Sequence, residues 1–311
     1  MKMAKSLVLV FHKEDDGPLF EKIVIALKER YTLVSAPELE DLLLKKKELK
    51  NICHISFDDG YKSFYTIIFP ILKKHGVPVS LFISPEIIAS GKNYWFQEIE
   101  GYDEALLKNI LADRLKIPYS SISKFPIMAI FKCLPANTIK NIIEQYQQQT
   151  GCGTKVSENI SIDQLKEMSA SGLVTAGAHT INHPVLANED DNNCRYEISG
   201  SVKQLASITG QPVKYFAYPN GRPGFDFDKR EISYLEENNI ALAFSTELGH
   251  IAANTNPLSI PRMGFARMGL TPSNPLIYYR LNAGKKWINI KAIGKPSEKE
   301  VRKKIKTILG I

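Results

Sequence analysis

Short apolar runs alternate along the chain with segments in which apolar residues recur at three- and four-residue intervals. Helical spacing of this kind is clear at residues 19–30, 63–75 and 162–170. The apolar runs have the length of strands and lie at residues 7–11, 52–57, 79–83, 173–178, 213–218 and 241–245, with a weaker run at 258–260. Near-continuous apolar strands that alternate with helices are typical of a parallel sheet covered on both faces. The pattern therefore predicts an α/β fold with mostly parallel strands.

Seven or eight strand–helix units are enough to close a barrel, and an open doubly wound sheet is the alternative. A nucleotide-binding version of the open sheet carries a glycine-rich turn after its first strand. Here Phe11-His12-Lys13-Glu14 occupies that position. We therefore expect a (β/α) barrel and no nucleotide-binding fold.

One connection breaks the alternation. About ninety residues separate the third apolar run from the fourth, far more than one crossover helix needs. Residues 103–149 have helical spacing, and the aromatic sequence Asn93-Tyr94-Trp95-Phe96 precedes them. We predict a barrel over residues 1–275, with a helical insertion at about 92–160 over one edge of the rim, and a basic C-terminal tail at 276–311. Trp95 is a candidate contact for a sugar ring, although packing onto the barrel explains most aromatic residues of such an insertion.

The composition is that of a soluble globular protein, with 44% hydrophobic and 23% charged residues. The apolar run at residues 7–11 is too short for the core of a signal peptide, and no run reaches the length of a membrane span. The four cysteines form no Cys-x-x-Cys pair. We therefore expect a cytoplasmic protein whose cysteines are reduced.

The formal net charge is +7, and many of the cationic residues lie in the predicted tail. They are Lys285, Lys286, Lys291, Lys295, Lys299, Arg302, Lys303, Lys304 and Lys306. A nucleic-acid surface would also need interleaved aromatic residues or a known binding motif, and the sequence shows neither. A solvated helix face is one reading of the tail. Peripheral contact with an anionic membrane surface, at the inner face of the membrane, is the other.

Two polar motifs carry the candidate chemistry. Ser56-Phe57-Asp58-Asp59-Gly60-Tyr61 ends the second apolar run, and His179-Thr180-Ile181-Asn182-His183-Pro184 follows the fourth. One carboxylate and two neutral imidazoles form a set of metal ligands that leaves positions open for water and substrate. The second carboxylate is then free to act as a base on that water. Each motif alone is often structural, as a turn or a packed histidine pair. Together they favour metal-dependent hydrolysis.

Polar and reactive residues also follow other predicted strands. His12 ends the first, and Tyr218-Pro219-Asn220-Gly221 follows the fifth. In a barrel the carboxyl ends of the strands form one face, where active sites are built. Four strand ends therefore bring ligands, a base and a candidate acid to one rim.

These residues resemble the polysaccharide deacetylases of carbohydrate esterase family 4. The Phe-Asp-Asp-Gly and His-Thr-x-x-His motifs are the most specific signatures of that family, and the resemblance extends over about residues 7–265. It implies a distorted barrel of seven or eight strands. The implied reaction is hydrolysis of the acetamide of an N-acetylated sugar, which gives a free amine and acetate.

The resemblance also implies roles for individual residues. Asp58 corresponds to the catalytic base, and Asp59, His179 and His183 correspond to the ligands of a divalent metal, for which zinc is expected. The acid of the family is a histidine, often late in the chain. A subgroup that acts on extracellular poly-N-acetylglucosamine supplies it from the end of the first strand instead, and Phe11-His12 is similar to that arrangement.

His250 after the sixth run is the rival acid. The chain departs from the family pattern in two places. Ala217 stands where many members have an arginine that orients the base, and Arg262 is the candidate to supply that charge. Asn220 stands where a tyrosine is common. A main-chain N–H in the turn formed by Tyr218, Pro219 and Asn220 is expected to stabilise the oxyanion, so that substitution has little effect.

The expected function is hydrolysis of a linear amide C–N bond. The substrate is an N-acetylated amino sugar of a glycan precursor or lipid-linked saccharide in surface polysaccharide biosynthesis. Removal of another small acyl group, such as formyl, is an alternative. A catalytically silent glycan-binding protein on the same fold is another, although such a protein would not need the full set of Asp58, Asp59, His179 and His183.

Overall fold

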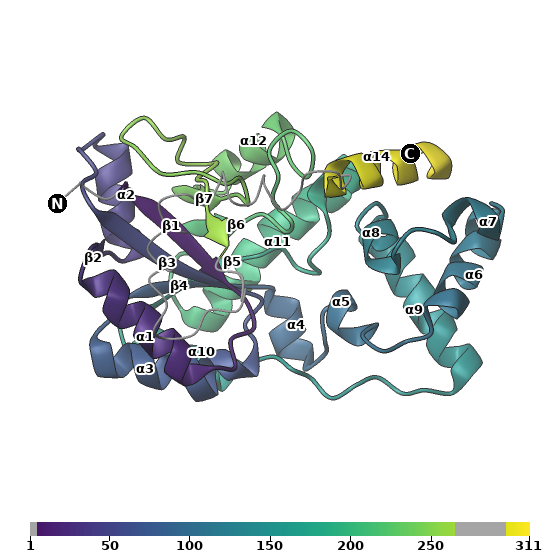
Figure 1. Cartoon of the computed structure of the whole chain (residues 1–311), viewed down its shortest axis with the longest axis horizontal. Helices are drawn as coiled ribbons and strands as arrows, with labels where there is room; N and C mark the ends of the chain where they lie inside the picture. The colour runs from purple at the N-terminus through teal and green to yellow at the C-terminus, as the bar shows by residue number, and fades with distance from the viewer. Residues whose placement is uncertain (1–4, 265–296) are drawn as a thin grey trace.

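The computed structural model describes residues 5–264 and 297–311, and its centre is one parallel sheet. The strands run in the order β7-β6-β5-β4-β3-β1-β8, and β2 pairs with β3 beside this path. Every pair of strands is parallel. The strands are β1 (Leu7–Phe11), β2 (Thr32–Leu33), β3 (Ile52–Asp58), β4 (Val79–Ile83), β5 (Val174–Ala178), β6 (Tyr215–Ala217), β7 (Leu242–Phe244) and β8 (Met263–Gly264). Figure 1 shows the curved sheet with helices around it. The predicted α/β distorted barrel is confirmed.

The sequence located the main strands closely. β1 and β4 have the predicted bounds. β3 and β5 differ from their predicted bounds by one residue at one end, and β6 and β7 are shorter by one or two residues at each end. The weak run at 258–260 is wrong as a strand, because it forms only an isolated bridge between Ile260 and Phe244. Two-residue strands β2 and β8 were missed, since neither is long enough to show a hydrophobic pattern.

Residues 257–264 close the barrel between its two edge strands. Pro257 O and Ile260 O accept from the N–H groups of Ala243 and Ser245, so this segment first runs along β7. A few residues later β8 pairs with β1. One irregular segment thus links β7 to β1, which explains why the barrel is distorted.

Helices cover the outside of the sheet. They are α1 (Gly17–Lys28), α2 (Ala36–Leu44), the π-helix η1 (Phe64–Ile68), α3 (Phe69–His75), α4 (Pro85–Ser90), α10 (Ile162–Ala170), the 3-10 helix η2 (Leu186–Asn188), α11 (Asp191–Thr209) and α12 (Lys229–Glu237). Local signals set their ends. Helix α10, for example, begins with a capping box in which Ser161 and Gln164 satisfy each other's backbone N–H groups.

Strand β3 shows how the sheet delivers its polar residues. Cys53, Ile55 and Phe57 pack in the main core, whereas the alternate residues His54, Ser56 and Asp58 face the other side of the strand. Below the rim, the ring of Phe57 packs against those of Phe11, Phe20 and Phe64 at centroid distances of 5.1, 5.6 and 4.7 Å. This aromatic cluster holds the carboxyl ends of β1 and β3 together.

The long connection between β4 and β5 forms a group of helices beside the barrel, on the right in Figure 1. These are α5 (Trp95–Glu98), α6 (Glu104–Leu115), α7 (Tyr119–Ile122), α8 (Ile127–Phe131) and α9 (Ala136–Thr150). They surround their own apolar core, which also takes in Ile305 of α14 (Glu298–Leu309).

Helix α14 belongs to the region predicted as a basic tail. Its Lys299, Lys303 and Lys304 are exposed. Arg302 is fully buried instead, and its Nη1 lies 2.7 Å from Asp226 Oδ1 in the loop before α12. Glu298 contacts both Lys132 of the insertion and Arg222 of the barrel, at 3.0 and 2.9 Å. Lys285, Lys286, Lys291 and Lys295 lie outside the described residues. Within residues 5–264 and 297–311, no helix combines the length and apolar character that a membrane span requires.

Candidate metal centre and active site

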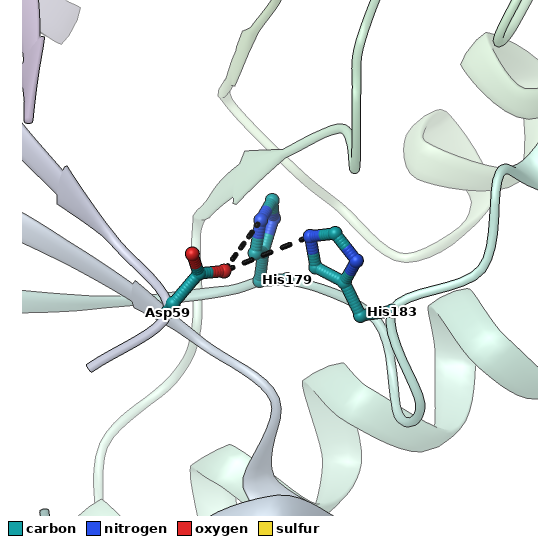
Figure 2. Close-up of side chains that lie close together, drawn as sticks. All are labelled: Asp59, His179 and His183. Atoms are coloured by element: carbon teal, nitrogen blue, oxygen red, sulfur yellow. Dashed lines mark ion pairs between the residues drawn. The ribbon is translucent and has the colours of Figure 1, made fainter. Parts of the chain in front are cut away.

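Asp59, His179 and His183 meet at the carboxyl end of the sheet. Asp59 Oδ1 lies 3.7 Å from His179 Nε2 and 3.6 Å from His183 Nε2, and all three side chains are buried. Figure 2 shows the carboxylate and both imidazoles turned toward one point. Asp59 follows the last residue of β3 in a left-handed conformation, with a φ of 72°. This conformation turns its side chain away from the direction that Asp58 takes.

The three side chains fit a divalent cation. Two ligands on one tetrahedral zinc ion lie about 3.3 Å apart, close to the separations in this cluster. Asp59 Oδ1 is buried and has no hydrogen-bond partner among the described residues. A buried carboxylate oxygen that faces two imidazole nitrogens without a proton donor is the arrangement that a cation satisfies.

The protonation of these three side chains without a metal also favours cation binding. Burial lowers the pKa of His179 to about 4, so its imidazole is neutral and its nitrogen is available to a metal. Burial, followed by the electrostatic effect of the neighbouring His179, also lowers the pKa of His183. Burial and the neighbouring Asp58 raise the pKa of Asp59 well above its ordinary value. A bound cation would remove that penalty by compensating the buried negative charge.

The two histidines are held differently. His179 Nδ1 lies 2.7 Å from the carbonyl oxygen of Ala217, which keeps its proton on Nδ1 and leaves Nε2 toward Asp59. His183 instead packs edge-on against the rings of Tyr94 and Phe96, at centroid distances of 5.4 and 5.1 Å. These rings come from the beginning of the insertion, so this segment forms one wall of the centre.

Asp58 does not point to the same place as Asp59. Its two oxygens accept from Arg262 Nη1 and Nη2 at 2.8 Å each, and Arg262 is 1% exposed. Burial alone would raise the pKa of Asp58, but the charge of Arg262, with smaller contributions from His179 and His12, outweighs burial and holds it at about 2. The structure therefore places beside the candidate metal ligands a carboxylate that stays ionised at neutral pH.

His12 lies next to this pair. Its Nε2 is 3.9 Å from Asp58 Oδ2, and its side chain is 55% exposed. Desolvation by the neighbouring protein nevertheless lowers its pKa, with Arg262 and Lys132 adding to the effect and Asp58 opposing it. Attraction to Asp58 is therefore not the dominant influence on the charge of His12.

His250 lies toward the opposite end of the barrel. The N–H of the next residue, Ile251, donates to the carbonyl oxygen of Ser6, which directly precedes β1. His12 directly follows β1, and a strand of this length spans roughly 17 Å. The geometry therefore favours His12 over His250 as the group close to Asp58.

The turn after β6 offers one main-chain donor rather than three. The N–H of Tyr218 donates to Phe244 O in the sheet, and Pro219 has no N–H. The side chain of Tyr218 is buried, donates to Leu258 O and stacks on Phe227, so it does not face the site. Asn220 has a left-handed φ of 58°, and within the described residues its N–H donates to no acceptor. Of the three predicted residues, only Asn220 has an N–H available for an oxyanion.

Trp95 contacts the backbone of the metal centre. Its indole N–H donates to His183 O at 3.2 Å, while the ring packs against Phe96 and Phe131. These contacts fix Trp95 beside His183, and its contact with a sugar ring stays a prediction.

A cavity of about 350 Å³ lies next to the site, between the residues that follow β1 and β3. Its wall includes Lys13, Tyr61, Lys62, Val156 and Glu158. Lys13 binds Glu158 at 2.8 Å and lies over the ring of Tyr61, and Lys62 Nζ donates to Ser157 O. These contacts join the rim to the segment that leaves the insertion.

Comparison with solved structures shows the same fold at low sequence identity. Streptococcus pyogenes deacetylase PplD in complex with acetate matches with a TM-score of 0.58 and 18% identity, over 88% of this chain and 98% of that one. IcaB from Ammonifex degensii has a TM-score of 0.58 and 19% identity, over 85% and 93%. The BpsB deacetylase domain from Bordetella bronchiseptica has a TM-score of 0.53 and 16% identity, over 84% and 96%. No protein with a curated description matches the sequence.

A protein-family model gives the assignment. The model for polysaccharide deacetylase matches residues 45–123 and 128–242, more than half of the chain. The matched region contains Asp58, Asp59, His179 and His183, whereas His12 and Arg262 lie outside it. The chain belongs to the polysaccharide deacetylase family.

Proposed function

We propose that this protein is a metal-dependent hydrolase that removes the N-acetyl group from an amino sugar of a saccharide. The observation that carries the proposal is the pairing of two neighbouring carboxylates with different partners. Asp59 faces two imidazole nitrogens, and Asp58 is held ionised by Arg262. This division of roles is what a metal-assisted attack by water requires.

A divalent cation held by Asp59, His179 and His183, with zinc as the expected ion, would lower the pKa of a water molecule and polarise the acetamide carbonyl. Asp58 is the base that takes a proton from the attacking water. Arg262 fixes the orientation of Asp58 through two parallel hydrogen bonds and keeps it ionised.

Two further groups complete the reaction. The N–H of Asn220 donates to the oxygen that becomes negative when water attacks the carbonyl carbon. His12 gives a proton to the departing amine, which is a poor leaving group as an anion. Its exposed edge and its distance of 3.9 Å from Asp58 suit this role. Because its pKa is lowered, the rate is expected to depend on how His12 gains its proton.

The cavity beside the rim supports a saccharide longer than one sugar. It adjoins the residues that follow His12 and Asp59, and its volume lies in the range of small-molecule sites. A sugar next to the one that is deacetylated fits this position. A glycan precursor or lipid-linked saccharide of surface polysaccharide biosynthesis, met in the cytoplasm, remains our proposal for the natural substrate.

Acetate release from a panel of N-acetylated monosaccharides, oligosaccharides and lipid-linked amino sugars tests the function. The protein is first freed of metal and then reloaded with zinc, cobalt or manganese. Acetate release that needs the metal and is lost in Asp59→Ala is the expected result. Release of formate but not acetate from matched substrates would identify a different acyl group. If neither acetate nor formate is released with any metal, the protein is a glycan-binding protein without catalytic activity.

A further inference from the structure

The loop that carries both histidine ligands has an unusual backbone. Within residues 179–183, Thr180 and His183 have left-handed φ values of 65° and 58°. Non-glycine residues adopt this conformation only when their surroundings enforce it. Two such residues in one short loop mean that specific contacts hold it in shape, inside the loop between His183 N–H and Thr180 Oγ1 and also from outside it.

One such contact comes from Glu197, in the second turn of α11. The side chain is 3% exposed. Oε2 accepts from the N–H groups of Ile181 and Asn182, at 2.8 and 2.9 Å, and Oε1 accepts from Asn182 Nδ2 at 2.8 Å. All three donors lie between the two histidines, so a single carboxylate binds the middle of the loop.

Helix α11 also provides an apolar seat for the same loop. A Cβ atom on Gly200, three residues after Glu197, would lie 3.0 Å from Ile181 Cδ1. Ile181 is 1% exposed, so its side chain fills the space that Gly200 leaves on the helix. The loop is therefore fixed on α11 by a hydrogen-bonded carboxylate and by close packing one turn later.

The orientations of the two histidine rings depend to different degrees on this attachment of the loop to α11. Metal-binding histidines usually donate their second ring N–H to an acceptor that orients the ring. His179 does so through Ala217 O. His183 Nδ1 is buried and has no hydrogen-bond partner among the described residues. The direction of its ring is thus set by the backbone of the loop and by its contacts with Tyr94 and Phe96.

We propose that Glu197 is a positioning residue of the metal centre, which fixes the loop between His179 and His183 and so directs His183 Nε2 toward Asp59. Glu197 does not contact the metal; it binds the backbone that carries two of the ligands. The inference rests on the metal-binding part of the proposed function and is independent of the substrate.

Metal affinity, measured below the unfolding temperature, tests the role. The full chain is stripped of metal and titrated with Co²⁺, whose visible absorption reports coordination by nitrogen and oxygen, and with Zn²⁺ in competition with a chromophoric chelator. Glu197→Ala is expected to raise the Kd by about 10- to 100-fold, the usual loss for a group that orients a ligand. Glu197→Gln keeps an acceptor for the two main-chain N–H groups and is expected to recover most of the affinity.

Glu189→Ala is the matched control. Glu189 is also buried and accepts from a main-chain N–H, that of Ala136, but it does not touch the histidine loop. This variant is expected to lose thermal stability without losing metal affinity. Equal losses of affinity in Glu189→Ala and Glu197→Ala would overturn the proposal, and so would an unchanged Kd in Glu197→Ala.

A substitution at an exposed residue tests the proposal if Glu197→Ala does not fold. Asn182→Ala removes one of the three donors from the surface of the loop. A rise of a few-fold in Kd supports the proposal, and an unchanged Kd contradicts it. The wild-type titration separates this test from that of the function. If the wild-type protein binds no metal, the proposed centre fails; if it binds metal and the variants match it, only the role of Glu197 fails.

Discussion

Replacement of Asp58 by asparagine tests the division of labour between the two neighbouring carboxylates. Asparagine has nearly the same shape, but it cannot take a proton from water at neutral pH. Loss of a general base typically costs ~10²- to 10⁴-fold in rate. Asp59 and both histidines are untouched, so metal content should equal that of the wild-type protein.

The same change has a structural cost that can be separated from catalysis. Arg262 is 1% exposed and gives two hydrogen bonds to Asp58. Breaking a buried ion pair by removing one partner destabilises a protein by about 3–5 kcal/mol, because the other charge is left uncompensated. Asp58→Asn should therefore lower the free energy of unfolding by up to this amount. Adding Arg262→Met removes the stranded charge and should restore much of the stability while the activity stays lost.

Three measurements on the same preparations decide the outcome. Acetate release gives the rate, zinc content after dialysis gives the occupancy of the metal centre, and urea unfolding gives the free energy. A rate within about threefold of the wild-type rate in Asp58→Asn would falsify the assignment of Asp58 as the base, given the usual ~10²-fold minimum. Loss of zinc would show that Asp58 is a ligand. A double variant no more stable than Asp58→Asn would show that the buried charge of Arg262 is not the source of the instability.

Four further outcomes follow from the structure. His12→Ala should reduce acetate release by at least ~10²-fold, whereas His250→Ala should have little effect, and the reverse ranking would identify His250 as the acid. Val156 lines the cavity and is 86% exposed. Val156→Asp should raise the KM for oligosaccharides several-fold more than the KM for monosaccharides. Equal changes in the two KM values would exclude the cavity from substrate binding. Co-sedimentation with anionic vesicles should weaken as salt rises if the exposed lysines of α14 reach a membrane, since such charges are screened over ~8 Å at physiological ionic strength; binding that ignores salt would contradict this. Burial lowers the pKa of His54 to about 4 in the folded protein, so on acidification the imidazole takes up its proton in the unfolded chain before it does in the folded one. The free energy of unfolding should therefore fall as pH drops from about 6.5 toward 4. Urea unfolding of His54→Gln should show a flatter pH dependence, and an equally steep one would exclude His54 as the cause.

The sequence predicted the parts of the fold that depend on neighbouring residues. β1 and β4 have the predicted bounds because buried parallel strands are continuous apolar runs. The candidate metal ligands were found for a related reason. Asp59 and His179 directly follow such runs, and the carboxyl ends of parallel strands meet at one edge of the sheet.

Residues that act across long separations left no local signal. Glu197 looks like any acidic residue on a helix, and only its contact with a loop some 15 residues earlier shows what it binds. Tyr94 and Phe96 were visible as aromatic residues, but their position beside His183 depends on the fold of the insertion. Asn220 provides the available N–H of the turn because the N–H of Tyr218 donates to Phe244 O in the sheet, a contact that the sequence does not show.

The position of Ile305 gives the synthesis of this protein a fixed order. The insertion is made early, yet its core is complete only when Ile305 of α14 is buried in it. Because a ribosome releases the amino-terminal part first, the insertion leaves the ribosome with one side of its core uncovered and waits for residues 297–311. The barrel contains most of its own partners by residue 264 and can form earlier. Trp95 packs against this core and donates to His183 O, so the side of the candidate metal centre that it supports is among the last parts of the molecule to become rigid, and newly made chains should acquire tight metal binding only after α14 has docked.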